Sequence, residues 1–209
     1  MKANYLILVI LLAIFSAGCV NVDEGIADIE SNENILVDVD GNVYKTIKIG
    51  DQVWMAENLK STKFRNGDPI STTPNGTCVA YEEQPIYYWY YPTDFDLYEC
   101  TFYTWYAVND ERGLAPKGWH IPTKDEWQIM FNEIRDNPDA YEHVAYGYRC
   151  HFGKYMKDSH DITYWWTSSA YNEEEGYIRV INIDNSEMSL ASAGKGYGLP
   201  IICVKDEIE

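Results

Sequence analysis

The feature that most constrains the fold is a helix start in the middle of the chain, Thr123-Lys124-Asp125-Glu126. A threonine followed three residues later by a glutamate is typical of a capping box, in which each side chain bonds the main chain of the other residue. Apolar residues then recur at the spacing of one helical face: Trp127, Met130, Phe131 and Ile134. The pattern predicts one main helix over residues 124–136, which ends where Asn137-Pro138 disfavours helical geometry.

Strand patterns flank this helix on both sides. Before it, residues 36–49 alternate around Asp40-Gly41, a dipeptide typical of hairpin turns, and residues 52–55 follow a second turn. After it come four strand-like segments separated by turn residues: 164–169, 177–183, 187–191 and 199–205. The sequence therefore predicts an α+β fold, with an antiparallel sheet assembled from both ends of the domain, one main helix and long irregular loops.

The region between the first strands and the helix is rich in turn residues. Residues 61–100 are expected to be mostly loop. Phe102, Trp105 and Tyr106 share one face at helical spacing, which predicts a short helix within 100–108.

Residues 1–18 have the composition of a secretory signal peptide. One lysine precedes an apolar run at 5–15, which is shorter than the roughly 20 residues that span a bilayer. Small residues then end at Cys19, an arrangement that resembles the lipobox of bacterial lipoproteins, although Ser16 stands where leucine is usual. The resemblance implies that acyl chains on Cys19 anchor the mature chain to a membrane. An ordinary cleaved signal peptide is the alternative.

Composition divides the rest of the chain and limits its partners. Residues 19–36 are acidic and contain no aromatic residue, which is typical of a tether, and residues 37–209 are long enough for one domain with a substantial core. The whole chain carries 33 acidic and 16 basic side chains, a formal net charge of −17. Because phosphate binding needs a basic surface, this balance argues against a nucleic-acid partner.

Four cysteines follow Cys19, an even number that favours two disulfides in an exported chain. They are Cys78, Cys100, Cys150 and Cys203. Three pairings are possible, and Cys78–Cys100 with Cys150–Cys203 is preferred because each bond then closes within one half of the domain. No pair has Cys-x-x-Cys spacing, which argues against a zinc site or a thioredoxin-type redox motif.

The order of motifs resembles the Fibrobacter succinogenes major paralogous domain. The motifs run from VDVDGNVYKTIKIGDQVWMAENLK through YYWYY, FYTWYAV, PKGWHIPTKDEW and YWWTSSAY to YGLPIICVKD, over about residues 37–206. The resemblance implies a surface-exposed or secreted bacterial module, largely of unknown function, with a C-type lectin-like fold.

Two positions depart from the family pattern. Ala115-Pro116 stands where members often carry Cys-Pro, and Ile202 stands where they carry arginine before the final cysteine. The first departure removes the usual partner of Cys203. This thiol must therefore pair elsewhere, with Cys150 preferred, or remain free.

His120 is the residue that most resembles a catalytic group. A general base needs an orienting partner, and nucleophilic catalysis needs an activated serine or cysteine nearby. The sequence around His120 offers no such nucleophile. We therefore expect His120 to hydrogen-bond across the junction between a strand and the helix. The residues assigned a structural role are Trp119, His120, Thr123, Glu126 and Trp127.

No metal or catalytic centre is assigned. The other histidines match no ligand spacing. Calcium remains possible through loop carboxylates, although solvated acidic loops are the preferred interpretation: Asp94, Asp96, Asp110, Glu111 and residues 173–175. The formylglycine-generating enzymes share the implied fold, but their pair of reactive cysteines is missing near this C-terminus. We therefore expect a protein without catalytic activity.

The chain has 18 tyrosines and 7 tryptophans, an excess that suits either a core or a binding surface. The candidate ligand-binding residues are Trp89, Tyr90, Tyr91, Trp165, Trp166 and Tyr171. Because side chains alternate along a strand, one of Trp165 and Trp166 should face inward and the other outward. The hypothesis is a lipid-anchored cell-envelope protein of the outer membrane, on its surface or in the periplasm, which binds a glycan or a protein partner. A structural or assembly component of the envelope is the alternative, and the glycan rests on fold analogy.

Overall fold

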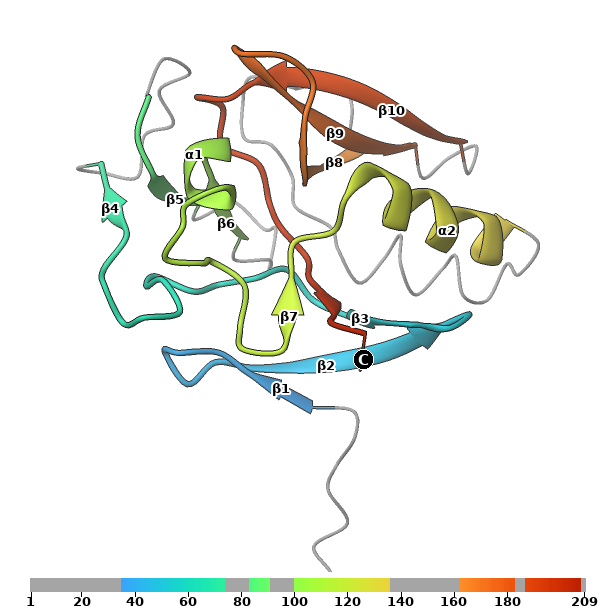
Figure 1. Cartoon of the computed structure of the whole chain (residues 1–209), viewed down its shortest axis with the longest axis horizontal. Coiled ribbons are helices and arrows are strands. Elements are labelled where there is room, and N and C mark those ends of the chain that lie inside the picture. The colour runs from blue at the N-terminus through green and yellow to red at the C-terminus, as the bar shows by residue number, and fades with distance from the viewer. Residues whose placement is uncertain (1–34, 74–82, 91–99, 136–161, 183–186, 208–209) are drawn as a thin grey trace, which may run out of the picture. The chain divides into compact units, whose positions relative to one another are not determined.

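The computed structural model describes five stretches of the chain: residues 35–73, 83–90, 100–135, 162–182 and 187–207 (Figure 1). The chain divides into two units, Met1–Glu33 and Asn34–Glu209, and all the described residues belong to the second unit. Within those stretches, no helix is both long and apolar enough to cross a membrane.

The first sheet joins the two ends of the domain. It contains, in order across the sheet, β1 (Ile35–Val37), β2 (Val43–Ile49), β3 (Gln52–Met55), β11 (Val204–Lys205) and β7 (Trp119–His120). Every neighbouring pair is antiparallel. The predicted sheet from both ends of the domain is therefore confirmed, and β1 and β7 are its two outer strands.

The hairpin between β1 and β2 turns at the predicted Asp40-Gly41. Gly41 has a φ of 85°, a conformation that glycine adopts without steric cost. The Asp38 carboxylate holds the turn, because it accepts hydrogen bonds from the main-chain N–H groups of Asp40 and Asn42, each at 2.9 Å, and from the Tyr44 hydroxyl at 2.6 Å. The hydrogen bonds of the Asp38 carboxylate are therefore made within the hairpin itself.

The strands of the last third form a sheet of their own, which corrects the expectation of a single sheet. β8 (Ile162–Ala170), β9 (Glu175–Asn182) and β10 (Glu187–Gly194) pair antiparallel in the order β10-β9-β8. β9 pairs with β10 along its whole length on one side and with β8 on the other, so its main-chain groups are bonded within this sheet and not to the first one. Only β11, from the predicted strand at 199–205, joins that sheet.

Residues 61–103 contain strands that the turn-rich sequence concealed. β4 (Ser71–Thr72) runs parallel to β5 (Ile86–Tyr90), and β5 pairs antiparallel with β6 (Cys100–Tyr103). The short helix α1 (Trp105–Val108) begins only after β6. Phe102 is therefore in a strand and not on the helical face predicted for it, because its main chain pairs with Tyr88.

The main helix lies where the sequence predicts it, as α2 (Lys124–Arg135). The capping box forms in both directions: Thr123 N–H donates to Glu126 Oε2 at 2.8 Å, and Glu126 N–H donates to Thr123 Oγ1 at 3.2 Å. Trp127 is fully buried and contacts Trp54 of β3 and Trp165 of β8, with ring centroids 5.1 and 5.7 Å apart. The helix therefore packs between the first sheet and the β8–β10 sheet (Figure 1). The predicted stop at residues 137–138 lies outside the described residues.

Candidate functional site

The structure removes Trp165 and Trp166 from the candidate binding surface. Both side chains have no exposed area, so the expectation that one of them faces outward is wrong. Alternation does send them to opposite faces of β8, but both faces are covered. Trp165 packs against Trp127 of α2, and Trp166 Nε1 donates to the main-chain oxygen of Tyr103 at 2.7 Å on the other side.

The remaining aromatic candidates do not form one described cluster. The main chain of Trp89 and Tyr90 belongs to β5 but their side chains are not described, and Tyr91 lies outside the described residues. Tyr171 is 53% exposed, and its ring meets that of Tyr177 edge-on with centroids 5.1 Å apart. Of the predicted ligand-binding residues that can be placed, Tyr171 alone is on the surface.

His120 forms the junction that the sequence predicts. Its Nε2 lies 2.6 Å from Glu126 Oε1, and its Nδ1 lies 2.7 Å from Asp206 Oδ1. The other oxygen of Glu126 accepts hydrogen bonds from Thr123. One imidazole therefore links β7, the first turn of α2 and the residue that follows β11.

The charges at this junction stabilise one another. The hydrogen bond to Glu126 raises the pKa of His120 to about 9, with a further contribution from Asp206, although burial opposes the shift. Burial also acts against ionisation of Glu126, but hydrogen bonds from His120 and Thr123 still lower the pKa of that carboxyl group. Near neutral pH the imidazole is therefore protonated and held between two carboxylates, which suits the structural role expected for it.

The acidic loops identify no calcium ligands. Asp94 and Asp96 lie outside the described residues. The Asp110 carboxylate is held by the Arg112 guanidinium, with two contacts of 2.8 Å, which lower the pKa of Asp110. Across the described stretches, no group of three or more His, Cys, Asp or Glu side chains is placed to hold a metal ion. Calcium binding stays a hypothesis without assigned ligands.

Cys203 carries a free thiol, so the Cys150–Cys203 disulfide is not formed in this structure. Its side chain is fully buried, and its main-chain oxygen accepts a hydrogen bond from Met55 N–H at 2.9 Å. This position beside β3 turns the thiol into the core, where burial raises its pKa. Cys78 and Cys150 lie outside the described residues and the Cys100 side chain is not described, so the Cys78–Cys100 pairing stays a prediction.

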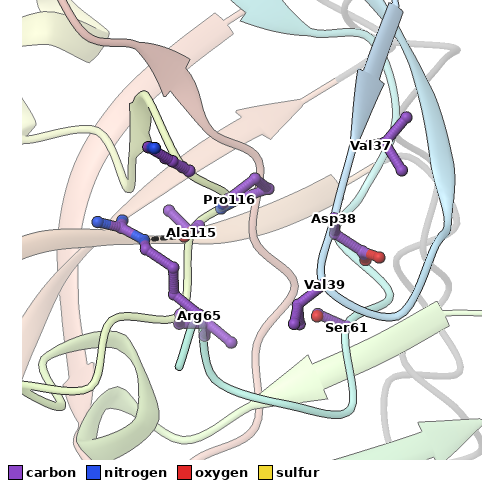
Figure 2. A pocket seen from close by; sticks show the side chains of 9 residues that line it. Val37, Asp38, Val39, Ser61, Arg65, Ala115 and Pro116 are labelled. Carbon is purple, nitrogen blue, oxygen red and sulfur yellow. Dashed lines mark hydrogen bonds between the residues drawn. The ribbon is translucent and has the colours of Figure 1, made fainter. Parts of the chain in front are cut away.

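A cleft of about 240 Å³ opens beside the end of β1. One wall is formed by residues 37–39, which lead from β1 into the hairpin turn, and the facing wall by residues 114–117, which lead into β7. Ser61 and Arg65 complete the lining, and Figure 2 shows Arg65 directed along the Ala115 wall. The cleft therefore lies between segments that adjoin the two outer strands of the same sheet.

Two cations border this cleft. The Arg65 guanidinium is fixed, because Nε donates to the main-chain oxygen of Ala115 at 2.8 Å and Nη2 donates to that of Trp119 at 3.1 Å. Lys117 is exposed on the same wall. Within the described part of the chain, neither cation forms a salt bridge with a carboxylate. The cleft thus has cationic groups in a chain whose net charge is −17.

Apolar side chains continue from the cleft onto the outer strand. We call this surface the β1 ridge; its residues are Ile35, Val37, Val39 and Val43, with exposed fractions of 46%, 52%, 42% and 60%. Val37 and Val43 are cross-strand partners, so their side chains lie on the same face. Val37 and Val39 also line the cleft, and the ridge and the cleft therefore form one continuous surface.

Sequence reasoning missed this surface, although one signal was present. In residues 35–39, ILVDV, the outward side chains are apolar and so is the inward side chain of Leu36. An outer strand with one solvated face normally alternates apolar and polar residues. No sequence signal places Arg65 against Ala115, because the two residues are separated by 50 positions.

The family model of the Fibrobacter succinogenes major domain matches residues 47–159, which is more than half of the 209-residue chain. The chain belongs to this family. No curated protein sequence matches the chain, and no solved structure does. The Fibrobacter succinogenes major domain match includes Arg65, the wall at 114–117 and α2, whereas the β1 ridge and strands β8–β11 lie outside the matched residues.

Proposed function

We propose that this chain is a lipid-anchored protein of the bacterial cell envelope whose domain binds a protein partner and catalyses no reaction. The observation that carries the proposal is the combined surface of the β1 ridge and the cleft. Ridge side chains are about half exposed, and they continue into a cleft bordered by two cations without carboxylate partners among the described residues. Contiguous exposed apolar surface with a polar border is typical of protein-binding sites.

The anchor and compartment of this proposal rest on the sequence. Cys19 in its lipobox-like context would carry the acyl chains, and the acidic segment 19–36 would hold the domain away from the membrane. The domain would then lie at the outer membrane, on its surface or in the periplasm. A sheet assembled from both ends of the domain, beside one main helix, supports a C-type lectin-like fold.

A glycan is the second candidate ligand, and Tyr171 is the observation that favours it. Tyr171 and Tyr197 are 53% and 49% exposed, and tyrosine rings combine an apolar face with a polar tip. The Tyr197 ring lies close to Gly194, and the neighbouring Glu175 carboxylate accepts a hydrogen bond from Ser192 at 3.0 Å. Against this candidate, Trp165 and Trp166, one of which was expected to face outward, are both buried. A structural role in the envelope is the remaining alternative.

Photo-crosslinking from the β1 ridge tests the protein-binding proposal. A photoreactive residue would replace Val37 in the full chain in its own cells, and the same residue at Ile129 of α2 serves as the control. Ile129 is a matched position because it is 50% exposed, against 52% for Val37. We expect one predominant adduct from Val37 and none of that mass from Ile129.

The partner identified in this way would then be purified and titrated with the full chain. Val37→Asp should abolish binding, since it places a charge on the apolar ridge, whereas Ile129→Asp should leave binding intact. Equal crosslinking from both positions, or a partner that binds Val37→Asp unchanged, would sink the proposal. Binding of soluble polysaccharides that is lost in Tyr171→Ala would favour the glycan instead.

A further inference from the structure

Resting on the proposed function, we infer that the occupant of this surface is an extended acidic segment of a partner protein. The segment adds to the free side of β1, places an apolar side chain in the cleft and sets a carboxylate side chain against Arg65 and Lys117. Three observations lead to this occupant: the size of the cleft, the direction of the main-chain groups of β1, and two cations that have no carboxylate partner among the described residues.

The cleft is small for a free ligand. Its volume of about 240 Å³ lies below the roughly 300–1,000 Å³ of pockets that hold drug-sized molecules. It is also open on one side to the β1 ridge, which a small molecule would leave exposed. A side chain of a longer segment fits these dimensions, because the rest of that segment would cover the ridge.

The main chain of β1 can accept another strand. Asp38 N–H donates to the main-chain oxygen of Asn42 at 3.1 Å, so the N–H of Asp38 faces β2. Hydrogen-bonded and non-bonded pairs alternate in an antiparallel ladder. The N–H and C=O groups of Val37 and Ile35 therefore point away from β2, on the outer side of the sheet. An extended segment added at a sheet edge uses such groups for affinity and side-chain pockets for specificity.

The cations select the charge of the segment. Two hydrogen bonds to main-chain oxygens hold Arg65 in place, so little side-chain entropy is lost when its remaining N–H groups meet a carboxylate. Lys117 adds a second positive charge on the same wall. The whole chain has a net charge of −17, which disfavours acidic segments over most of its surface. The Asp38 carboxylate also lines the cleft, but it already accepts hydrogen bonds within the β1–β2 hairpin.

The occupant can be tested with capped peptides of about ten residues in which valine alternates with aspartate or glutamate. A matched set carries lysine in place of the acids, and both sets are titrated against the full chain. We expect only the acidic set to bind, and more weakly as salt rises. Lys117→Glu should weaken binding about tenfold, whereas Lys48→Glu, the same charge change on an exposed lysine of β2, should change it by less than about twofold.

The outcomes separate this inference from the proposed function. If Val37→Asp abolishes binding of the crosslinked partner but Lys117→Glu leaves it unchanged, the protein-binding proposal stands and the acidic occupant is wrong. Binding of the lysine set would also overturn it. If the full chain self-associates and Val37→Asp makes it monomeric, the occupant is a second copy and the inference fails.

Discussion

The two outer strands of the five-stranded sheet differ in what contacts them. At β7, side chains from other parts of the chain bond to the strand. The His120 ring lies between Glu126 and Asp206, at 2.6 and 2.7 Å. The main-chain oxygen of Trp119 accepts a hydrogen bond from Arg65 at 3.1 Å. Residues that look catalytic in the sequence are therefore used here to join a strand, a helix and the C-terminal segment.

At the β1 edge, no strand of the described stretches pairs with the outer side of β1. Val37 and Val43 are 52% and 60% exposed, and the main-chain groups of Val37 point away from the sheet. Exposed, apolar outer strands are an aggregation hazard that proteins usually cover or charge. The difference between the two edges teaches that the residues around His120, which look most catalytic in the sequence, join structural elements, whereas the surface that we propose for a partner lies at the opposite edge.

The largest expected effect lies on the closed side, in the Trp127→Ala variant. Trp127 is fully buried against Trp54 and Trp165, so its truncation should lower the free energy of unfolding by about 3–5 kcal/mol. Val37→Ala on the open edge should change it by less than about 0.5 kcal/mol. Urea denaturation measures both values. Similar losses in the two variants would mean that β1 is part of the core and not a free edge.

The His120→Gln variant tests how the closure depends on pH. The pKa of His120 rises from 6.5 to about 9 on folding, so the protonated ring stabilises the fold fully below pH 6.5, and this contribution is lost as the pH passes through 9. Because the side chain is 39% exposed, solvent screening reduces the expected contribution to about 1–2 kcal/mol.

The measurement for His120→Gln is the difference in unfolding free energy from the unmodified chain at about pH 6 and about pH 10. We expect the difference in unfolding free energy to reach its whole value of about 1–2 kcal/mol at the lower pH and to be near zero at the higher pH. A difference that does not change with pH would show that His120 acts by packing and not by charge. The Ile129→Gln variant, on the exposed face of α2, provides the control.

The Thr123→Ala variant removes half of the capping box. The lost bond from Glu126 N–H to Thr123 Oγ1 should cost about 1 kcal/mol of stability. Thr123→Ser, which keeps the hydroxyl group, should recover most of this loss. If alanine and serine were equally destabilising, the methyl group would be the stabilising feature and the capping interpretation would be wrong.

The smallest expected effect on stability belongs to Lys117→Glu on the open side. Lys117 is exposed and has no salt bridge within the described residues. The melting temperature of the Lys117→Glu variant should therefore stay close to that of the unmodified chain. A clear loss of stability, measured by thermal unfolding, would place Lys117 in the structure of the fold and remove it from the proposed binding surface.

Local sequence signals predicted the parts of the fold that local interactions determine. The main helix follows from a cap and an apolar stripe within twelve neighbouring residues, 123–134, and the β1–β2 hairpin follows from Asp40-Gly41. The burial of both Trp165 and Trp166 could not be predicted in this way. Their alternation is correct, but α2 and β6 cover the two faces of β8 from distant parts of the chain.

The candidate site was predictable only in part. The apolar outward positions of residues 35–39 could have indicated an exposed surface on an outer strand. The cleft could not be predicted, because the hairpin turn, Arg65 and the 114–117 wall meet only after the two ends of the domain have formed one sheet. The division of the strands into separate sheets is equally non-local, since any of the predicted strands could have paired with another.

The most direct test of the open edge is amide hydrogen exchange of the full chain with and without the acidic peptides. The Val37 amide points away from β2, so it should exchange rapidly in the free protein and slow markedly when a strand is added, while the His120 amide stays unchanged. Protection of Val37 on binding is the predicted result. Protection confined to α2 or to the region of Tyr171, with Val37 unaffected, would contradict the account.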